Sequence, residues 1–224
     1  MLLPAAPPAR PAPPQRNFLE TYTNAGGERV HDALIASMAA SNGQSLPVSY
    51  LQLSHNSPVL AIWLADLPKQ MLELFDAVAR DVVLARYPDY GLITDDIHVR
   101  ITSLPIADSL RDLRQGHLNA LIKVPGVVTR RTGVFPQLKV LRFDCGKCGA
   151  VVGPFTQNDA SEVRPTSCPE CQAAGPFALN HELTVYRNYQ KITIQESPGS
   201  VPAGRVPRYK DVILLADLID SVSG

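Results

Sequence analysis

Four cysteines form the group of residues in this sequence that is best suited to binding a metal ion. They occur as two close pairs, Cys145-Gly-Lys-Cys148 and Cys168-Pro-Glu-Cys171, with nineteen residues between the pairs. Two pairs at this spacing can place four thiolates at the corners of a tetrahedron around Zn2+. Gly146 and Gly149 suit tight knuckles in which backbone N–H groups point at sulfur. The spacing therefore predicts a structural zinc site.

Three other chemistries compete with structural zinc: two disulfides, a redox-active pair and a catalytic zinc site. A catalytic zinc ion keeps an open coordination position, whereas four cysteines close the shell. The zinc deaminase pattern has proline where this sequence has Ser167, and it needs an upstream His-x-Glu that this sequence lacks. His181, beside Glu182, is expected at the surface rather than as a substitute ligand. No catalytic residue is predicted.

Basic side chains crowd the stretch that leads into the first cysteine pair. Residues 123–147 contain one acid, Asp144, and six bases: Lys123, Arg130, Arg131, Lys139, Arg142 and Lys147. In a chain whose 21 basic and 21 acidic residues cancel, this local excess suits the backbone of a nucleic acid. We expect DNA contacts from Arg130, Arg131 and Lys139, with Phe135 or Phe143 stacking on bases. The alternative is a solvated strand edge with core phenylalanines.

A second basic group follows a loop that is rich in proline and glycine. The loop is Ser197–Gly204, and the bases after it are Arg205, Arg208 and Lys210. A loop of this composition projects from a core rather than filling it. It could contact DNA or a neighbouring protein, and its residues alone leave both alternatives open.

Two function classes are disfavoured by what the sequence lacks. A phosphate-binding loop needs Gly-Lys followed by Ser or Thr, but the one Gly-Lys, at Gly146-Lys147, is followed by Cys148. We therefore expect the chain to be unable to hydrolyse ATP alone. The sequence has no run of about 18 apolar residues, which is the length that a membrane span needs. We expect a soluble protein in a reducing intracellular compartment, without a membrane partner.

The period of the apolar residues along the sequence predicts which elements position these side chains. Six of the first fourteen residues are proline, which predicts an extended, disordered tail over residues 1–16, either a linker or a ligand for a proline-recognition domain. Residues 17–96 have a helical period, with one helix ending near Asn42-Gly43 and a longer one between Asp66 and Pro88. Between Asp66 and Asp96 there are seven acids and three bases, so this helical part is acidic.

After Gly91 the period changes to two, which indicates strands. Ile97, Val99 and Ile101 alternate with polar residues, and we place the start of a second domain here. A short helix is predicted over residues 106–114, and strands over residues 118–129, 140–143, 183–186, 191–195 and 211–215. The sequence thus predicts an α+β fold, with a helical bundle followed by a small barrel such as an OB-fold.

Several segments together resemble the minichromosome maintenance (MCM) proteins, and most closely their eukaryotic subunit 2 branch. The likeness rests on residues 97–101, the Leu110-Arg-Asp-Leu-Arg segment with 117–119, the strand at 126–129, the cysteine pairs with Gly153-Pro-Phe, Tyr189 to Gly199, and residues 207–220. It implies an N-terminal region of a heterohexameric replicative DNA helicase that acts in replication licensing, initiation and fork unwinding in the nucleus during the cell cycle.

The resemblance also implies an assignment of domains, partners and sites. It implies a helical subdomain at 17–96, an OB-fold at 97–143 and 183–224, and an inserted zinc ribbon at 144–182. The partners would be the other MCM subunits and DNA, single- and double-stranded, in the ring channel. An inter-tier communication loop would contain Gln195, Glu196, Ser197, Pro198, Gly199, Arg205 and Arg208.

Two departures from the family pattern limit these expectations. The resemblance also places Thr129 at the DNA contact. Archaeal relatives carry basic residues where this sequence has Thr129 and Arg130, so the basic part of that role rests on Arg130 with Arg131 as a shifted substitute. The chain also stops before the remaining OB strands, so the OB-fold is expected to be incomplete and ATP to bind only in a missing C-terminal region. The alternative is a free-standing zinc-ribbon and OB-fold protein that binds single-stranded nucleic acid.

Overall fold

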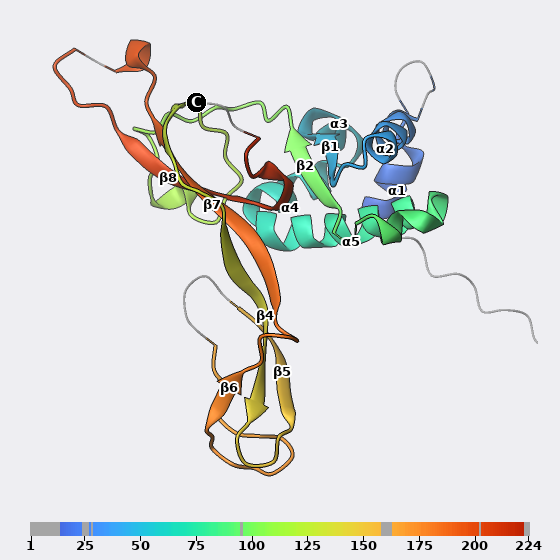
Figure 1. The fold of residues 1–224 in the computed structure, drawn as a ribbon. Helices are drawn as coiled ribbons and strands as arrows, with labels where there is room; N and C mark the ends of the chain where they lie inside the picture. Colours follow the sequence, from blue (N-terminus) through green and yellow to red (C-terminus); the bar gives the residue numbers. More distant parts are fainter. Residues whose placement is uncertain are drawn as a thin grey trace, which may run out of the picture. The chain divides into compact units, whose positions relative to one another are not determined.

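The chain folds into two compact units, Met1–Pro125 and Gly126–Gly224, and each is described by itself. The structure, a computed structural model, describes residues 14–23, 27, 29–94, 96–157, 163–201 and 203–221. The ribbon shows helices dominating the first unit and strands the second (Figure 1). Most of the tail predicted for residues 1–16 lies outside the described residues, but α1 already begins at Pro14. Proline is well tolerated there because the first helical N–H has no intrahelical partner.

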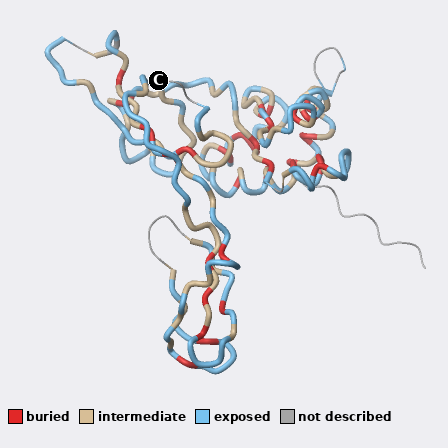
Figure 2. Tube along the Cα trace, viewed as in Figure 1, coloured by how far each residue is buried: buried red, intermediate tan, exposed pale blue. Residues whose placement is uncertain are grey.

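In its described residues, the first unit is a bundle of five α-helices around one core. The helices are α1 (Pro14–Thr21), α2 (Val30–Ala40), α3 (Tyr50–Asn56), α4 (Pro58–Asp66) and α5 (Pro68–Arg86), followed by the 3-10 helix η1 (Pro88–Leu92). The two predicted helices correspond to α2 and α5. Fully buried Ile35, Leu64 and Phe75 join three of the helices in the core. Figure 2 shows buried residues gathered between the helices, whereas much of the sheet of the second unit is exposed.

A two-stranded parallel sheet completes the first unit. Strand β1 (Ser45–Ser49) pairs with β2 (His98–Thr102). We predicted the strand at residue 97 as the start of the second domain, but it belongs to the helical unit. Its alternation correctly indicates one buried face, yet the pattern cannot say which core covers that face. Here the core of the helical unit covers it, because Val99 is buried in the same cluster as Phe75 of α5. Asp76 of α5 also accepts hydrogen bonds from the Val99 N–H (2.6 Å) and the His98 ring (3.0 Å).

The segment from residue 103 to 125 differs from its prediction. In place of a helix over residues 106–114 and a strand from Leu118, it contains turns and one 3-10 helix, η2 (Gln115–His117). Ile106 and Leu118 are mostly exposed, so their apolar character does not reflect burial within an element. Irregular backbone hydrogen bonds tie the segment together, as where the Asp108 N–H donates to the Lys123 carbonyl, fifteen residues on (2.8 Å).

The second unit, where it is described, is an antiparallel sheet of six strands. They are β3 (Val127–Arg131), β4 (Phe135–Cys145), β5 (Val151–Thr156), β6 (Phe177–Leu179), β7 (Val185–Gln195) and β8 (Tyr209–Leu215). The order is β3-β7-β4-β5, with β6 beside β4 and β8 beside β7. The strands predicted at 183–186 and 191–195 fall largely within the single strand β7, which begins at Val185. Two short 3-10 helices, η3 (Pro198–Ser200) and η4 (Ala216–Leu218), flank β8.

Strands β4 and β7 connect the two ends of this sheet. The first part of β7 pairs with β4, and its second part pairs with β3 and β8. The last residues of β4 pair instead with β5 and β6, which carry the cysteine region away from the other strands (Figure 1). None of the helices in the described part of the chain combines the length and apolar character that a bilayer crossing requires.

Candidate metal centre and nucleic-acid interface

The four cysteines meet at the end of the β4, β5 and β6 sheet. All their sulfur atoms lie within 4.8 Å of one another. The Sγ atoms of Cys145 and Cys171 are 3.6 Å apart, as are those of Cys148 and Cys168. A tetrahedral zinc site with Zn–S bonds of about 2.3 Å has S–S edges of about 3.8 Å, whereas a disulfide bond is about 2.05 Å long. The geometry therefore suits a metal ion held by four thiolates.

The two cysteine knuckles repeat the same backbone hydrogen bonds. In the first, the Cys145 N–H donates to the carbonyl five residues on (2.9 Å), and the Gly149 N–H donates back to the Cys145 carbonyl (2.8 Å). Cys168 and Gln172 repeat both bonds in the second knuckle, each at 2.9 Å. Gly149 and Gln172 also share a positive φ, +72° and +54°. Each knuckle therefore turns its two sulfur atoms toward one point.

Backbone donors favour a thiolate in the first knuckle. The N–H groups of Cys148 and Lys147 lower the pKa of Cys145 to about 6. At Cys148 the Ala150 N–H lowers the pKa, but hydrogen bonding with Cys171, burial and the other sulfur atoms outweigh it and raise the pKa to about 12. The two thiols also act on each other, because a first negative charge disfavours a second one close by. A cation at the centre would remove that repulsion.

The cysteine region has a small core of its own. Its fully buried members are Cys145, Val152 and Cys168, and the partly buried side chains around them are Ala150, Phe155 and Phe177. A core of this size supplies little burial energy, so modules of this kind depend on their metal. His181 is exposed and contacts the Tyr186 hydroxyl (3.1 Å), and it does not join the cysteine cluster among the described residues.

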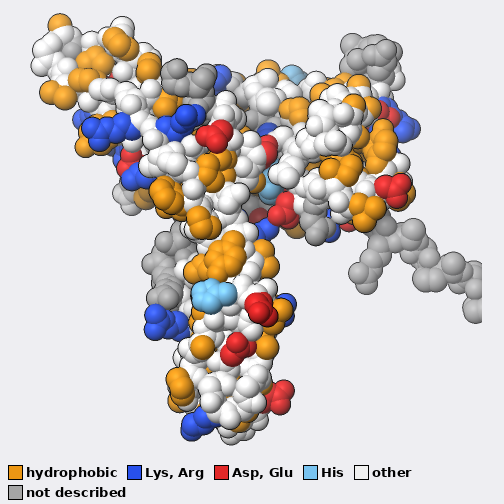
Figure 3. Space-filling view, viewed as in Figure 1, with side chains coloured by type: hydrophobic (Ala, Val, Ile, Leu, Met, Phe, Trp, Pro, Cys, Tyr) orange, Lys and Arg blue, Asp and Glu red, His pale blue; other side chains and the backbone are white. Residues whose placement is uncertain are grey.

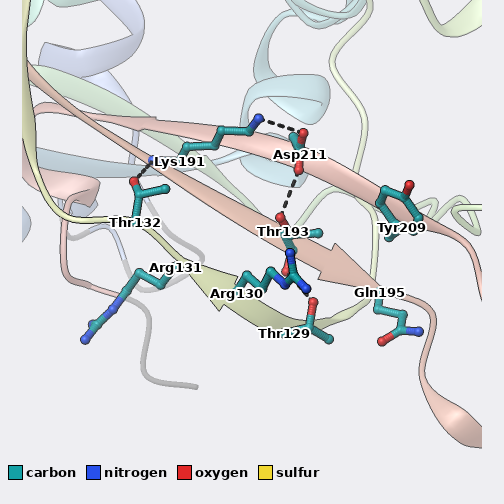
Figure 4. Close-up of a pocket in the computed structure, with 9 residues that line it drawn as sticks. All are labelled: Thr129, Arg130, Arg131, Thr132, Lys191, Thr193, Gln195, Tyr209 and Asp211. Carbon is teal, nitrogen blue, oxygen red and sulfur yellow. Dashed lines mark hydrogen bonds and ion pairs between the residues drawn. The ribbon is translucent and has the colours of Figure 1, made fainter.

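A groove of about 740 Å³ crosses the other end of the sheet, over β3, β7 and β8. Figure 4 shows the side chains that line it: Thr129, Arg130, Arg131, Thr132, Lys191, Thr193, Gln195, Tyr209 and Asp211. Three of them are cations, one is an acid and one is aromatic. The predicted residues Thr129, Arg130 and Arg131 thus come together in one surface depression.

Two of the three groove cations are already paired with acids. Lys191 Nζ lies 2.9 Å from Asp211, and this hydrogen bond, with a second from Thr193, holds the pKa of Asp211 below its usual value. Arg131 lies 3.6 Å from the exposed carboxylate of Asp220. Within the described part of the chain, Arg130 forms no ion pair. The Arg130 guanidinium is therefore the groove cation most available to an anionic ligand.

A β-bulge brings both arginines to the groove. The register of β3 against β7 shifts between Val128 and Arg130, so Thr129 has no partner residue on β7. In a regular strand Arg130 and Arg131 would point to opposite faces, and a bulge re-aims side chains. Thr129 instead donates its hydroxyl to the Thr193 carbonyl (3.2 Å). Figure 4 shows Arg130 extending near Thr129, with Arg131 extending away from Lys191.

Other residues predicted to bind nucleic acid lie elsewhere. Lys139 is half-buried on β4 and does not line the groove. Phe143 is 8% exposed and packs edge-on against Phe155, so it is a core residue and the prediction that it could stack on bases is wrong. Phe135 is 49% exposed, with its ring 5.9 Å from that of Tyr189.

Sequence reasoning missed several groove residues, namely Lys191, Thr193, Tyr209 and Asp211. Lys191, Thr193 and Gln195 occupy alternate positions of a predicted strand, which places them on one face. That alternation indicates that these three side chains share a surface. It could not show that β7 lies between β3 and β8, which is what puts Thr193 opposite both Arg130 and Asp211.

The loop between β7 and β8 is closed at its base by Glu196. This side chain is buried, and its carboxylate accepts a hydrogen bond from the Arg208 N–H (2.9 Å). The Glu196 N–H donates in turn to the Arg208 carbonyl (3.0 Å). Arg205 is exposed in the loop. Of the predicted communication-loop residues, Glu196 and Arg208 thus hold the loop in place, while Arg205 is exposed to solvent.

Comparison with known proteins identifies the family. Residues 15–103 match the MCM N-terminal domain and residues 109–224 match the MCM OB domain. The DNA replication licensing factor mcm2 of Schizosaccharomyces pombe is 54% identical over 92% of this chain and 25% of its own length. Mcm2 of Drosophila melanogaster is 53% identical over 92% of the chain and 23% of its length.

A more distant archaeal relative shares the same region. The minichromosome maintenance protein of Saccharolobus solfataricus is 28% identical over 91% of the chain and 30% of its own length. The chain therefore spans about a quarter of the length of the relatives it matches. The family resemblance is confirmed over both units, and the OB match supports an OB-like second unit. The chain belongs to the minichromosome maintenance family, of which it comprises the N-terminal and OB domains.

Proposed function

We propose that this chain is the N-terminal assembly and DNA-binding region of a subunit of the heterohexameric replicative helicase, acting in replication licensing in the nucleus. The observation that carries the proposal is its identity of about 53% with eukaryotic licensing factors over 92% of its length. Because the chain spans about a quarter of those proteins, we assign it ring assembly and DNA guidance. ATP hydrolysis would be supplied by other parts of such a helicase.

The proposed cofactor is a structural zinc ion held by Cys145, Cys148, Cys168 and Cys171. The donor set supports zinc because thiolates are soft ligands and the four sulfur atoms lie within 4.8 Å of one another. Bound zinc would cross-link residues 144–182 into a rigid ribbon at the end of β4, suited to contacting another subunit. A closed shell of four cysteines leaves no coordination position for a substrate.

The proposed DNA interface is the groove over β3, β7 and β8. Arg130 and Arg131 would bind phosphates, with Thr129 fixing the bulge that aims them and Lys191 adding a third positive charge. Lys139 would contact DNA only from outside the groove. We propose that the loop from Gln195 to Arg208 contacts a neighbouring protein tier rather than DNA. Its base is fixed by Glu196, and its exposed residues can transmit a contact without unfolding the sheet.

Ring assembly is tested most directly by native mass spectrometry. The tagged chain would be co-expressed with the remaining ring subunits and purified by its tag. We expect species in which the 24.3 kDa chain is bound to other subunits. A chain recovered only as a monomer in their presence would overturn the assembly role. An immunoblot of the native product, with an antibody against residues 30–125, would show in parallel whether the cell makes it as part of a larger polypeptide.

A further inference from the structure

Helix α4 is apolar on every side, although only half of it is covered. Its sequence is Pro-Val-Leu-Ala-Ile-Trp-Leu-Ala-Asp, and Leu60, Ala61 and Leu64 are buried in the core. On the opposite side Val59, Ile62 and Trp63 are 53%, 58% and 49% exposed. A helix that is hydrophobic all round is normally buried all round. A surface helix packed on one core has no need of a second apolar side.

The exposed residues form a continuous stripe. Val59, Ile62, Trp63 and Asp66 follow the spacing that aligns side chains on one side of a helix. Leu67 extends the stripe, because its N–H donates to the Trp63 carbonyl (2.8 Å) and its side chain is 53% exposed. We call these five residues the α4 face. On the side of the molecule drawn in Figure 3, apolar side chains lie at the surface of the helical unit beside acidic ones.

An apolar groove runs beside this stripe. It has a volume of about 270 Å³ and is lined by Tyr50, Ala65, Leu104, Pro105, Ile106, Asp108, Leu121 and Ile122. Ala65 belongs to α4, and its carbonyl accepts a hydrogen bond from the Leu121 N–H (3.3 Å). Ile106 is 70% exposed at the groove. The α4 face is therefore a ridge that contains an aromatic residue, and the groove beside it can take an apolar side chain.

The charge at the end of α4 indicates what kind of partner would fit. Asp66 is exposed at the C-terminal end of the helix, where the macrodipole is negative and a cation is favoured. It forms no ion pair within the described residues. Lys69, at the start of α5, is exposed and forms no ion pair with Asp66 among the described residues. A base from outside the chain would satisfy both Asp66 and the helix end.

We propose that the α4 face is a docking site for an amphipathic helix of another protein, with Trp63 as the anchor and a lysine or arginine of the partner opposite Asp66. Tryptophan dominates the energy of many interfaces, and helix ridges pack into the grooves of a second helix. A second copy of this chain fits less well because the α4 face contains no base. An anionic lipid surface would repel Asp66. The inference concerns the first unit alone and is independent of the metal centre and the DNA groove.

Site-specific photo-crosslinking in the full chain tests this proposal. A photoreactive amino acid would replace Ile62, and a control chain would carry it at Ser37, an exposed residue of α2. We expect crosslinks from position 62 to a segment of another protein that has an apolar stripe of helical period beside a lysine or arginine. The proposal is overturned by crosslinks to a second copy, to the second unit of the same chain, to lipid or to an acidic segment. A yield no higher than at position 37 also overturns it.

A peptide of the crosslinked segment then tests the chemistry of the contact. The chain has a single tryptophan, so the emission of Trp63 reports binding at this site directly. We expect a blue shift on titration, an affinity at least tenfold lower for Ile62→Glu, and binding largely lost for Asp66→Lys. Exchanging the basic residue of the peptide for glutamate should restore binding to Asp66→Lys and weaken it for the unaltered chain. Failure of this charge exchange would refute the role of Asp66.

Discussion

The charges in the groove predict how Arg130→Ala changes the salt dependence of DNA binding. Three cations line it, but Lys191 is paired with Asp211 and Arg131 with Asp220, so Arg130 has the charge most available to a phosphate. Each phosphate contact with single-stranded DNA contributes about 0.7 to the slope of log K against log salt. We expect Arg130→Ala to reduce that slope by about 0.7. Arg131→Ala should reduce it by less, because Asp220 already neutralises part of the Arg131 charge.

The predicted difference is measurable by fluorescence anisotropy with a labelled oligothymidylate. Between about 50 and 200 mM NaCl, one phosphate contact corresponds to a change in affinity of about 2.6-fold. The unaltered chain should therefore lose about 2.6-fold more affinity over this range than Arg130→Ala does. Lys69→Ala is a matched control, since it removes one exposed positive charge from the helical unit. An unchanged slope for Arg130→Ala, or an equal decrease for Lys69→Ala, would show that binding does not use the groove.

Three further predictions concern stability. Cys145→Ser should lower the zinc content of the purified chain, measured by plasma mass spectrometry, from one ion to none and unfold the ribbon, while the helical unit keeps its circular dichroism; one zinc ion per mutant chain would contradict the metal assignment. Gln172→Gly should slow zinc release, because Gln172 has the left-handed φ that costs a side-chain residue roughly 1 kcal/mol. Gly149→Gln should accelerate zinc release for the same reason, and not through a steric clash, since a Cβ at Gly149 would meet no atom within 4 Å. Equal rates of zinc release from both variants and the unaltered chain would exclude backbone strain. His31, fully buried 4.9 Å from the Phe18 ring, has its pKa lowered by burial, so it stabilises the fold above about pH 6.5 and loses that contribution as the pH falls. His31→Leu should therefore flatten the pH dependence of chemical denaturation below pH 6.5, and an unchanged pH profile would show that His31 is solvated.

Local features of the fold could be predicted because they depend on neighbouring residues. The apolar period over residues 66–87 indicates α5, since side chains three and four residues apart share one helix face. The cysteine pairs come together as their spacing predicts, because each knuckle is a single turn whose two thiols face the same way. The acidic character of the helical part and the α+β composition follow directly from residue types.

Other features depended on which distant segments meet. Alternation in residues 97–101 predicts a half-buried strand, but its pairing with β1 and its contact with Asp76 of α5 assign it to the helical unit. The same limitation explains why the prediction for Phe143 was wrong, since its apolar ring fits equally well on a DNA-binding surface or in a core. Burial at these positions is decided by the partner segment, and its identity is not encoded in the local period.

The two candidate sites differ in what the sequence by itself determined. The four candidate metal ligands are specified by residue type and short spacing, because thiol chemistry and a tight turn are local properties. The groove is specified only by the tertiary structure, which uses a bulge at Thr129 to aim Arg130 and places β7 between β3 and β8. A metal site needs a few ligands at one point, whereas an interface needs side chains from several strands whose register is set by packing.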